Sequence, residues 1–181
     1  MEKGHSASEA RRLLIGTLHG AVEGILSVGQ QVRTLDYLNR GTTRFIPLHG
    51  AKSIRPFLTL QGNAVSVNIA MVLWVTELKV TRPGGLSKVK PQLNRCAVRF
   101  CLPTCEASGF LHTPLQGDPF ARLNQDRGAF LALTSASLIG ADTEMTFEFL
   151  AVNSQHVVSA EIIAQDDTTL EGASMFEEVS S

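Results

Sequence analysis

Three cysteines are the residues best able to do chemistry in this sequence, and they lie close together at Cys96, Cys101 and Cys105. Together with the imidazole of His112, they could hold a metal ion. Their spacing matches no structural zinc pattern, however, and they fall on an expected strand and the turn after it. Cysteine is also a common buried residue that packs as a small apolar side chain. The sequence therefore predicts reduced thiols rather than a disulfide framework, with neither a metal site nor a cofactor.

The histidines do not indicate catalysis. None of them belongs to a recognisable nucleophile–base arrangement, and glycine-rich phosphate loops are absent from the sequence. His49 follows an expected strand and fits a surface loop near Arg44. The sequence therefore predicts a protein that is not an enzyme and has no catalytic residues. The histidines are His5, His19, His49, His112 and His156.

Basic residues in the first half of the chain are the best candidates for a partner-binding surface. An RNA or an acidic peptide would suit such a surface, because Lys and Arg neutralise phosphates and carboxylates. Tyr37 is the only obvious aromatic residue nearby on which a base could stack. The predicted partner-binding residues are Arg33, Arg40, Arg44, Lys52 and Arg55.

The charge is distributed unevenly along the chain. Up to Pro91 the sequence has twelve Lys and Arg against five Asp and Glu, about +7, and beyond it four against twelve, about −8. This asymmetry indicates an anionic partner for one half, attraction between the two halves, or drift of solvated surface charge. If copies attract, the acidic half or tail of one chain docks on the basic half of the next. Such a head-to-tail contact closes into a ring or continues as a filament.

The sequence that contains these candidate residues has an internal repeat, which occurs in two copies. Leu38-Asn39 followed by Phe45-Ile46-Pro47-Leu48 recurs as Leu123-Asn124 followed by Phe130-Leu131-Ala132-Leu133, with identical spacing. When the alignment is extended without gaps, apolar positions keep falling on apolar positions. Each copy is longer than a solenoid repeat and has the size of a small domain. The alternative is two unrelated β segments that share a pattern.

Apolar patterning and turn signals predict about five short strands and one helical turn in each copy. Gly24 inside a strand indicates a bend or bulge, and Pro47 indicates an edge or a bulge. A small, strongly bent barrel has this content, and closing the sheet removes its edges. The predicted strands are Arg12–Leu18, Val22–Val28, Arg44–Leu48, Ala64–Asn68 and Ala70–Leu78, then Ala97–Leu102, Ala107–Leu111, Ala129–Thr134, Glu144–Val152 and Gln155–Ile163. The helical turns fall within Gly29–Arg40 and at Pro119–Leu123.

These signals also predict the domain organisation. No apolar run approaches the roughly 20 residues of a membrane helix, and the N-terminus lacks an apolar signal-peptide core. We therefore expect no membrane partner and a cytoplasmic location. The expected segments are a polar N-terminus at 1–11, a basic barrel at 12–78, a Pro/Gly linker at 79–95, an acidic barrel at 96–164 and a disordered acidic tail at 165–181.

Both copies resemble a small uncharacterised bacterial domain family. The first does so from Gly24 through Leu38-Asn39, Phe45–Leu48 and Val67-Asn68 to Val72, and the second through Phe130–Thr134 and Ala151–Asn153. Members of the family look like Sm-like barrels with a short helical insert before the third strand. The resemblance implies two tandem small Sm-like β-barrels within a mainly β protein.

The wider resemblance to Sm proteins is incomplete. Sm proteins carry an Asp and an Asn between the second and third strands, where this sequence has Asp36 and Asn39. They carry an Arg-Gly after the fourth strand, where this sequence has Asn68-Ile69 and Asn153-Ser154. That Arg helps Sm proteins hold RNA, since its planar fork suits phosphate and base contacts. The departure argues against uridine recognition.

Repeated asparagines and apolar residues are expected to be structural. Asn caps turns and tolerates the left-handed conformation, which is common where a helical turn ends, as at Asn39 and Asn124. The residues predicted to be buried are Leu26, Leu38, Phe45, Leu48, Val67, Val72, Leu111, Leu123, Phe130, Leu133, Val152 and Val157.

Small barrels leave little interior for a substrate, so function is expected on loops, edges and faces. The sequence predicts a non-enzymatic binding or scaffolding module that self-associates, as a homo-oligomer, or docks a protein partner through its barrel faces. An RNA-binding Sm-like protein that uses the basic first barrel is the alternative.

Overall fold

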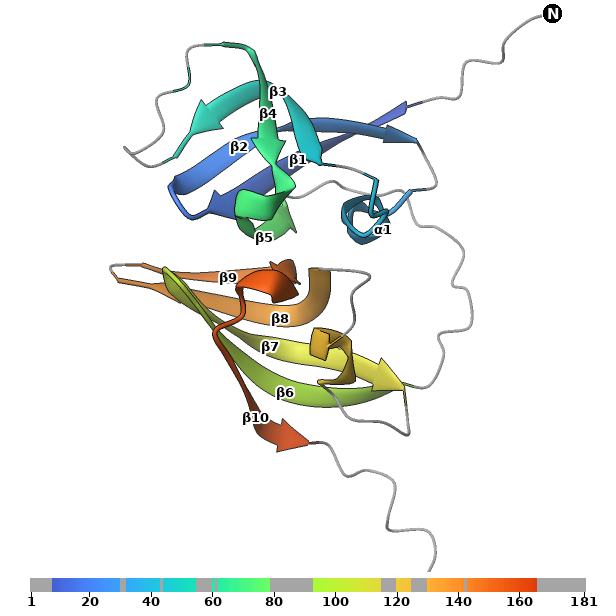
Figure 1. Ribbon diagram of the computed structural model, residues 1–181, viewed down its shortest axis with the longest axis vertical. Helices are drawn as coiled ribbons and strands as arrows, with labels where there is room; N and C mark the ends of the chain where they lie inside the picture. Colours follow the sequence, from blue (N-terminus) through green and yellow to red (C-terminus); the bar gives the residue numbers. More distant parts are fainter. Residues whose placement is uncertain are drawn as a thin grey trace, which may run out of the picture.

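The computed structural model shows a mainly β protein whose elements occur in the same order twice (Figure 1). It describes residues 8–29, 32–42, 44–54, 60, 62–78, 93–114, 120–124, 130–141 and 143–165. The first half contains β1 (Ser8–Thr17), β2 (Gly20–Gly29), α1 (Thr34–Leu38), β3 (Phe45–Ser53), β4 (Ala64–Asn68), η1 (Ile69–Met71) and β5 (Val72–Glu77). The second half contains β6 (Leu93–Leu102), β7 (Cys105–Pro114), η2 (Ala121–Asn124), β8 (Phe130–Gly140), β9 (Glu144–Asn153), η3 (Ser154–His156) and β10 (Ser159–Gln165).

The two halves keep a constant sequence offset of 85 residues. β6 begins 85 residues after β1, and the same offset separates β7 from β2, β8 from β3 and η3 from η1. The offset is the one at which Leu38-Asn39 meets Leu123-Asn124 in the sequence. The same residue number plus 85 therefore identifies structurally corresponding positions in the two halves.

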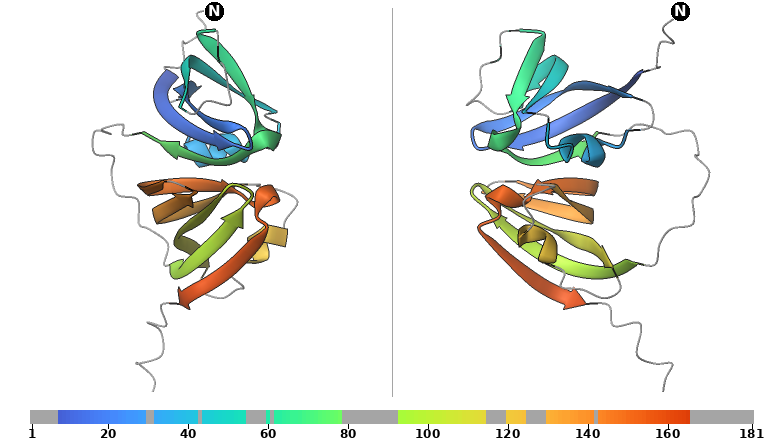
Figure 2. Two further views of the ribbon diagram at one scale, coloured as in Figure 1. Left: turned by 90° about the vertical axis from the view of Figure 1, so that its left-hand side faces the viewer. Right: turned by 45° about the vertical axis from the view of Figure 1, so that its right-hand side comes forward.

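The prediction of two closed barrels was wrong. The ten strands of the described residues form one antiparallel sheet in the order β10-β6-β7-β8-β9-β5-β1-β2-β3-β4. The sheet is not closed, because the first and second halves join through β5 and β9 instead of each half pairing its own ends. Pairing across the halves satisfies two strand edges, as closure of each half would have done. The halves do not interleave, and they lie one above the other in both views of Figure 2.

Glycine permits the bend that each half needs. The pairing of β2 with β3 shifts register between Glu23 and Ile25, and that of β7 with β8 shifts between Ser108 and Phe110. Gly24 and Gly109 lie at these shifts. A Cβ on Gly24 would meet the Cβ of Leu48 at 2.9 Å, closer than packed side chains allow. The bulge expected at Gly24 is therefore confirmed.

Two apolar clusters form the core, and each contains residues of both halves. The cluster of the second half includes Leu14, Leu73 and Trp74 from the first. The cluster of the first half includes Phe130 and Ala151 from the second. Because each core includes side chains from the other half, neither half can bury all of its apolar residues alone.

Most residues predicted to be buried are buried, but Phe45 is not. Leu123 and Val157 are half-buried. The predicted core residues that are buried are Leu26, Leu38, Leu48, Val67, Val72, Leu111, Phe130, Leu133 and Val152. Phe45 is 52% exposed, although its counterpart Phe130 is 2% exposed. Phe45 begins β3 beside β4, the last strand of the sheet among the described residues.

The strands extend beyond the predicted bounds at both N-terminal ends. β1 begins at Ser8 inside the expected polar segment, and β6 begins at Leu93 inside the expected linker. Residues 1–7 of the polar segment lie outside the described residues, as do residues 79–92 of the linker and residues 166–181 of the tail. Within the described chain, no helix is long and apolar enough to cross a membrane.

Candidate functional site

The junction between the halves, here called the seam, is formed by β5 and β9. Trp74 pairs with Val152 and Val75 with Ala151 in an antiparallel register. All residues from Val72 to Thr76 are buried, and so are those from Leu150 to Asn153. Strands covered on both faces read as continuous apolar runs rather than alternating ones. The run Val72-Leu73-Trp74-Val75 is the sequence signal that could have identified this buried strand.

Two asparagine side chains extend the seam beyond the paired strands. Asn39 donates from Nδ2 to the carbonyl of Phe130 at 3.0 Å and accepts from the Phe130 N–H at 2.9 Å. Asn153 donates from Nδ2 to the Val72 carbonyl at 2.9 Å. Asn153 also caps η3 by accepting from the Gln155 N–H, which confirms the expected capping role there, whereas Asn39 bonds a distant strand and not its own turn. The left-handed conformation expected at Asn39 is wrong, since its φ is −89°.

Two further bonds cross the seam from other side chains. The Thr76 hydroxyl donates to the Phe149 carbonyl at 2.6 Å. The ring Nε2 of His156 donates to the Ala70 carbonyl at 2.7 Å. Together with the asparagines, these side chains donate to backbone carbonyls on the opposite side of the seam.

A buried ion cluster holds α1 in place. Arg11 is 3% exposed and donates to Glu77 at 3.3 Å, to Thr34 at 3.1 Å and to Glu9 at 3.2 Å. Thr34 also donates to Glu77. Thr34 begins α1, and α1 contacts β8 of the second half. The cluster thus positions the turn that presents Asn39 to the seam.

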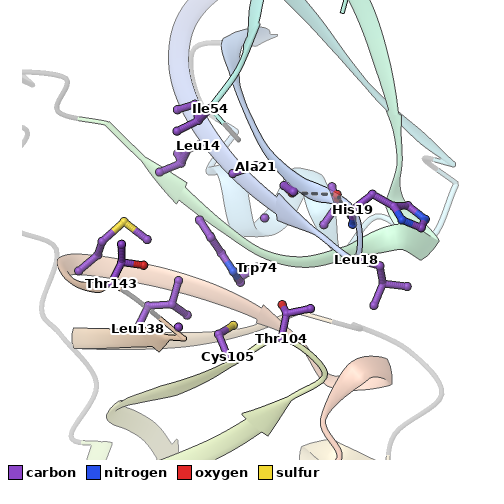
Figure 3. A pocket seen from close by; sticks show the side chains of 15 residues that line it. Leu14, Leu18, His19, Ala21, Ile54, Trp74, Thr104, Cys105, Leu138 and Thr143 are labelled. Carbon is purple, nitrogen blue, oxygen red and sulfur yellow. Dashed lines mark hydrogen bonds between the residues drawn. The ribbon is translucent and has the colours of Figure 1, made fainter. Parts of the chain in front are cut away.

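An apolar pocket of about 890 Å³ lies beside the seam (Figure 3). Its walls come from both halves and include Leu14, Leu138 and Met145. Trp74 lies between Leu14 and Leu138 in Figure 3. Its indole fills the space above Gly16, where an added Cβ would approach it to 2.1 Å. The lining of the pocket includes the imidazole of His19 and the thiol of Cys105. The pocket can enclose an apolar group, but it offers no recognisable catalytic arrangement.

The two outermost strands, β4 and β10, are the other distinctive feature. They end the sheet and have no strand on their outer side among the described residues. β10 and the turn before it expose Val158, Ile162 and Ile163, and the β4 end exposes Phe45 and Met71. Val158 is 70% exposed, whereas its counterpart Leu73 at the seam is fully buried. We refer to β4 and β10 as the outer edges.

The structure separates the predicted basic residues. Arg33, Arg40 and Arg44 are exposed and lie around α1 and the start of β3. Lys52 is exposed at the opposite end of β3. Arg55 lies outside the described residues. The described chain thus brings three of the five predicted residues to one region.

The cysteines are free thiols in three different surroundings. Burial raises the pKa of the Cys96 thiol. Burial also raises the pKa of the Cys105 thiol, and hydrogen bonds from Thr104 and Trp74 partly offset that effect. No group of three or more His, Cys, Asp or Glu side chains that could hold a metal ion is found in the described parts of the chain.

Cys96 is therefore expected to react slowly with iodoacetamide. The thiolate is the nucleophile, and a raised pKa keeps the buried thiol protonated at neutral pH. Unfolding should restore the ordinary pKa near the reference value of 9.0, so modification in urea should be faster. Because the folded pKa is raised, this thiol stabilises the fold below the unfolded pKa and loses that effect as pH rises above it. Peptide mass spectrometry at several pH values measures the rates, and equal rates for folded and unfolded chain would contradict the prediction.

Comparisons with known proteins identify no relative. No family model, no curated protein and no solved structure matches this chain. The class that its own geometry defines is a mainly β protein, with a buried seam and two uncovered outer edges.

Proposed function

We propose that this protein is a non-enzymatic scaffold that binds protein partners by strand addition at its outer edges. The observation that carries the proposal is the exposure of apolar residues at both ends of the sheet. Phe45 and Met71 lie at one end, and Val158, Ile162 and Ile163 lie at the other. An edge strand presents unpaired N–H and C=O groups, and a partner strand can pair with them while its side chains cover the apolar ones.

The outer edges lack the usual protection against such pairing. Natural edge strands commonly carry Lys, Pro or an inward-pointing charge. β4 contains no charged residue and no proline, and the described part of β10 contains only Glu161, which pairs with Arg99 at 3.3 Å. β4 has five residues and β10 has seven, so each edge has an ordinary strand length and can pair with one matched partner strand.

The repeated order of elements supports the further proposal that both halves derive from one Sm-like unit by duplication. The RNA-binding alternative depends on the exposed Arg33, Arg40 and Arg44. Arg33 and Arg40 flank α1, but Arg44 directly precedes Phe45 at the β4 end, so the β10 end at Val158 is where the two candidate functions use different residues. A single experiment can therefore distinguish them.

Site-specific photo-crosslinking in cells tests the proposal. A benzophenone amino acid is placed at Phe45 or Val158, at the two ends, and at Ile25, an exposed apolar residue of the internal strand β2. We expect protein adducts at Phe45 and Val158 but not at Ile25. Equal adducts at all three positions, or none, would contradict strand addition. Adducts that disappear on nuclease treatment, or that require Arg40 and Arg44, would instead favour RNA.

A further inference from the structure

We infer that the partner at both outer edges is a second copy of this chain. β10 of one copy pairs with β4 of the next, in the geometry that β5 and β9 already adopt within the chain. The inference rests on the proposed function, since it names the partner for the same edges. What carries it is the correspondence between the seam and the two ends of the sheet.

The constant offset makes this correspondence definite. β10 corresponds to β5 and β4 corresponds to β9. A contact between copies therefore repeats the seam with its two strands supplied by different chains. Because the seam pairs Trp74 with Val152 and Val75 with Ala151, the same register between copies pairs Ser159 with Val67 and Ala160 with Ser66.

The exposure of residues at the two ends of the sheet is what we expect if each outer edge normally pairs with a further strand. Phe130 is buried at the seam, and Phe45 in the corresponding position of the first half is exposed. Leu73 is buried at the seam, and Val158 in the corresponding position of the second half is exposed. Each end of the sheet thus exposes an apolar side chain next to its outer edge, at a position that corresponds to a buried one at the seam. A second copy would cover both kinds of position at once.

Asn153 and Asn68 occupy corresponding positions, and they also differ between the seam and the outer edge. Asn153 accepts from the Gln155 N–H at the start of η3, and Asn68 accepts from the Ala70 N–H at the start of η1. Asn153 also donates across the seam to Val72, whereas no hydrogen bond from the Asn68 amide group is seen in the described chain. In the assembled form Asn68 would donate to the Val157 carbonyl of the neighbouring copy.

The contact between copies should be weaker than the seam. Trp74, which contacts Phe147 at the seam, corresponds to Ser159, and His156, which bonds Ala70, corresponds to Met71. The assembly should therefore depend on protein concentration. It is head-to-tail, because it joins two different edges, and so it closes into a ring or continues as a filament.

Charge contributes little at these edges, which separates this contact from one guided by the basic and acidic halves. Screening at high salt weakens contacts between exposed charges. Here the paired strands are almost uncharged, so the mass in solution should not fall as salt rises. Disappearance of the assembly at high salt would favour the charge-guided contact and overturn this one.

Disulfide trapping between separately purified chains tests the register. One chain carries Ser66→Cys and the other Ala160→Cys, both with Cys101 and Cys105 replaced by Ser. The matched control replaces Ser66→Cys by Ala64→Cys, which lies on the same face of β4 and is also exposed. We expect a disulfide-linked dimer with Ser66→Cys and its loss with Ala64→Cys. Equal trapping of both would overturn the proposed register.

The mass of the wild-type chain by light scattering gives an independent readout that needs no variant. We expect it to rise with concentration, and to stay at that of one chain when Ala64→Lys and Ser66→Lys place charges on β4. A wild-type chain that stays monomeric at every concentration would overturn the inference. If photo-crosslinks to other proteins at Phe45 and Val158 nevertheless persist, the proposed function survives. If those crosslinks are also absent, the proposed function fails with it.

Discussion

Phe130→Ala should destabilise the protein by about 3–5 kcal/mol, whereas Phe45→Ala should cost about 1 kcal/mol or less. The two phenylalanines occupy corresponding positions at the starts of β8 and β3, so they form a matched pair. Phe130 packs in the core of the first half across the seam, and its removal leaves a cavity there. Phe45 is half exposed to solvent and leaves none. Urea denaturation monitored by the fluorescence of Trp74, the only tryptophan, measures both values.

The comparison is best made at a protein concentration low enough to keep the chain monomeric. At higher concentration, Phe45→Ala should additionally weaken self-association, because the proposed neighbour would cover that ring. Equal losses of stability for the two variants at low concentration would show that Phe45 is buried in solution. In that case the exposure of the β4 end, and with it the proposed function, would be wrong.

Arg11→Met should cost about 3–5 kcal/mol, the range for breaking a buried ion pair by removing one partner. Its removal leaves Glu77 without its guanidinium partner in a largely enclosed position, where the side chain is 19% exposed. The loss should spread to α1, because Thr34 is bonded to both charged groups. The melting temperature and the free energy of unfolding in urea report the effect.

Arg12 provides the control on the same strand. It pairs with Glu23, but its side chain is 59% exposed, so Arg12→Met should change stability by about 0–1 kcal/mol. The double variant with Arg11→Met and Glu77→Met should regain much of the loss, because it removes the unpaired charge as well. If Arg11→Met lowers the free energy of unfolding no more than Arg12→Met does, the ion cluster does not hold α1 in place.

Local patterns in the sequence determined the elements of this fold. The repeat offset predicted that the second half would present the same elements in the same order, and the strand and turn signals depend on residues a few positions apart. Gly24 marked a bulge because glycine inside a strand often does so, and in the fold a side chain there would collide with Leu48 of the neighbouring strand. Within the candidate seam, the sequence singled out Asn39 and Asn153 as structural residues, but not their partners.

Only the tertiary structure decided how the strand edges are satisfied. Closure of each half and pairing between the halves both remove the edges of β5 and β9, and both are compatible with the same strand patterns. The choice between them depends on contacts between residues such as Asn39 and Phe130, 91 positions apart, which no local pattern encodes. The exposure of Phe45 follows from that choice, because its apolar side chain lies where the sheet ends. The burial of Arg11 likewise required partners on α1 and β5 that lie far away in the sequence.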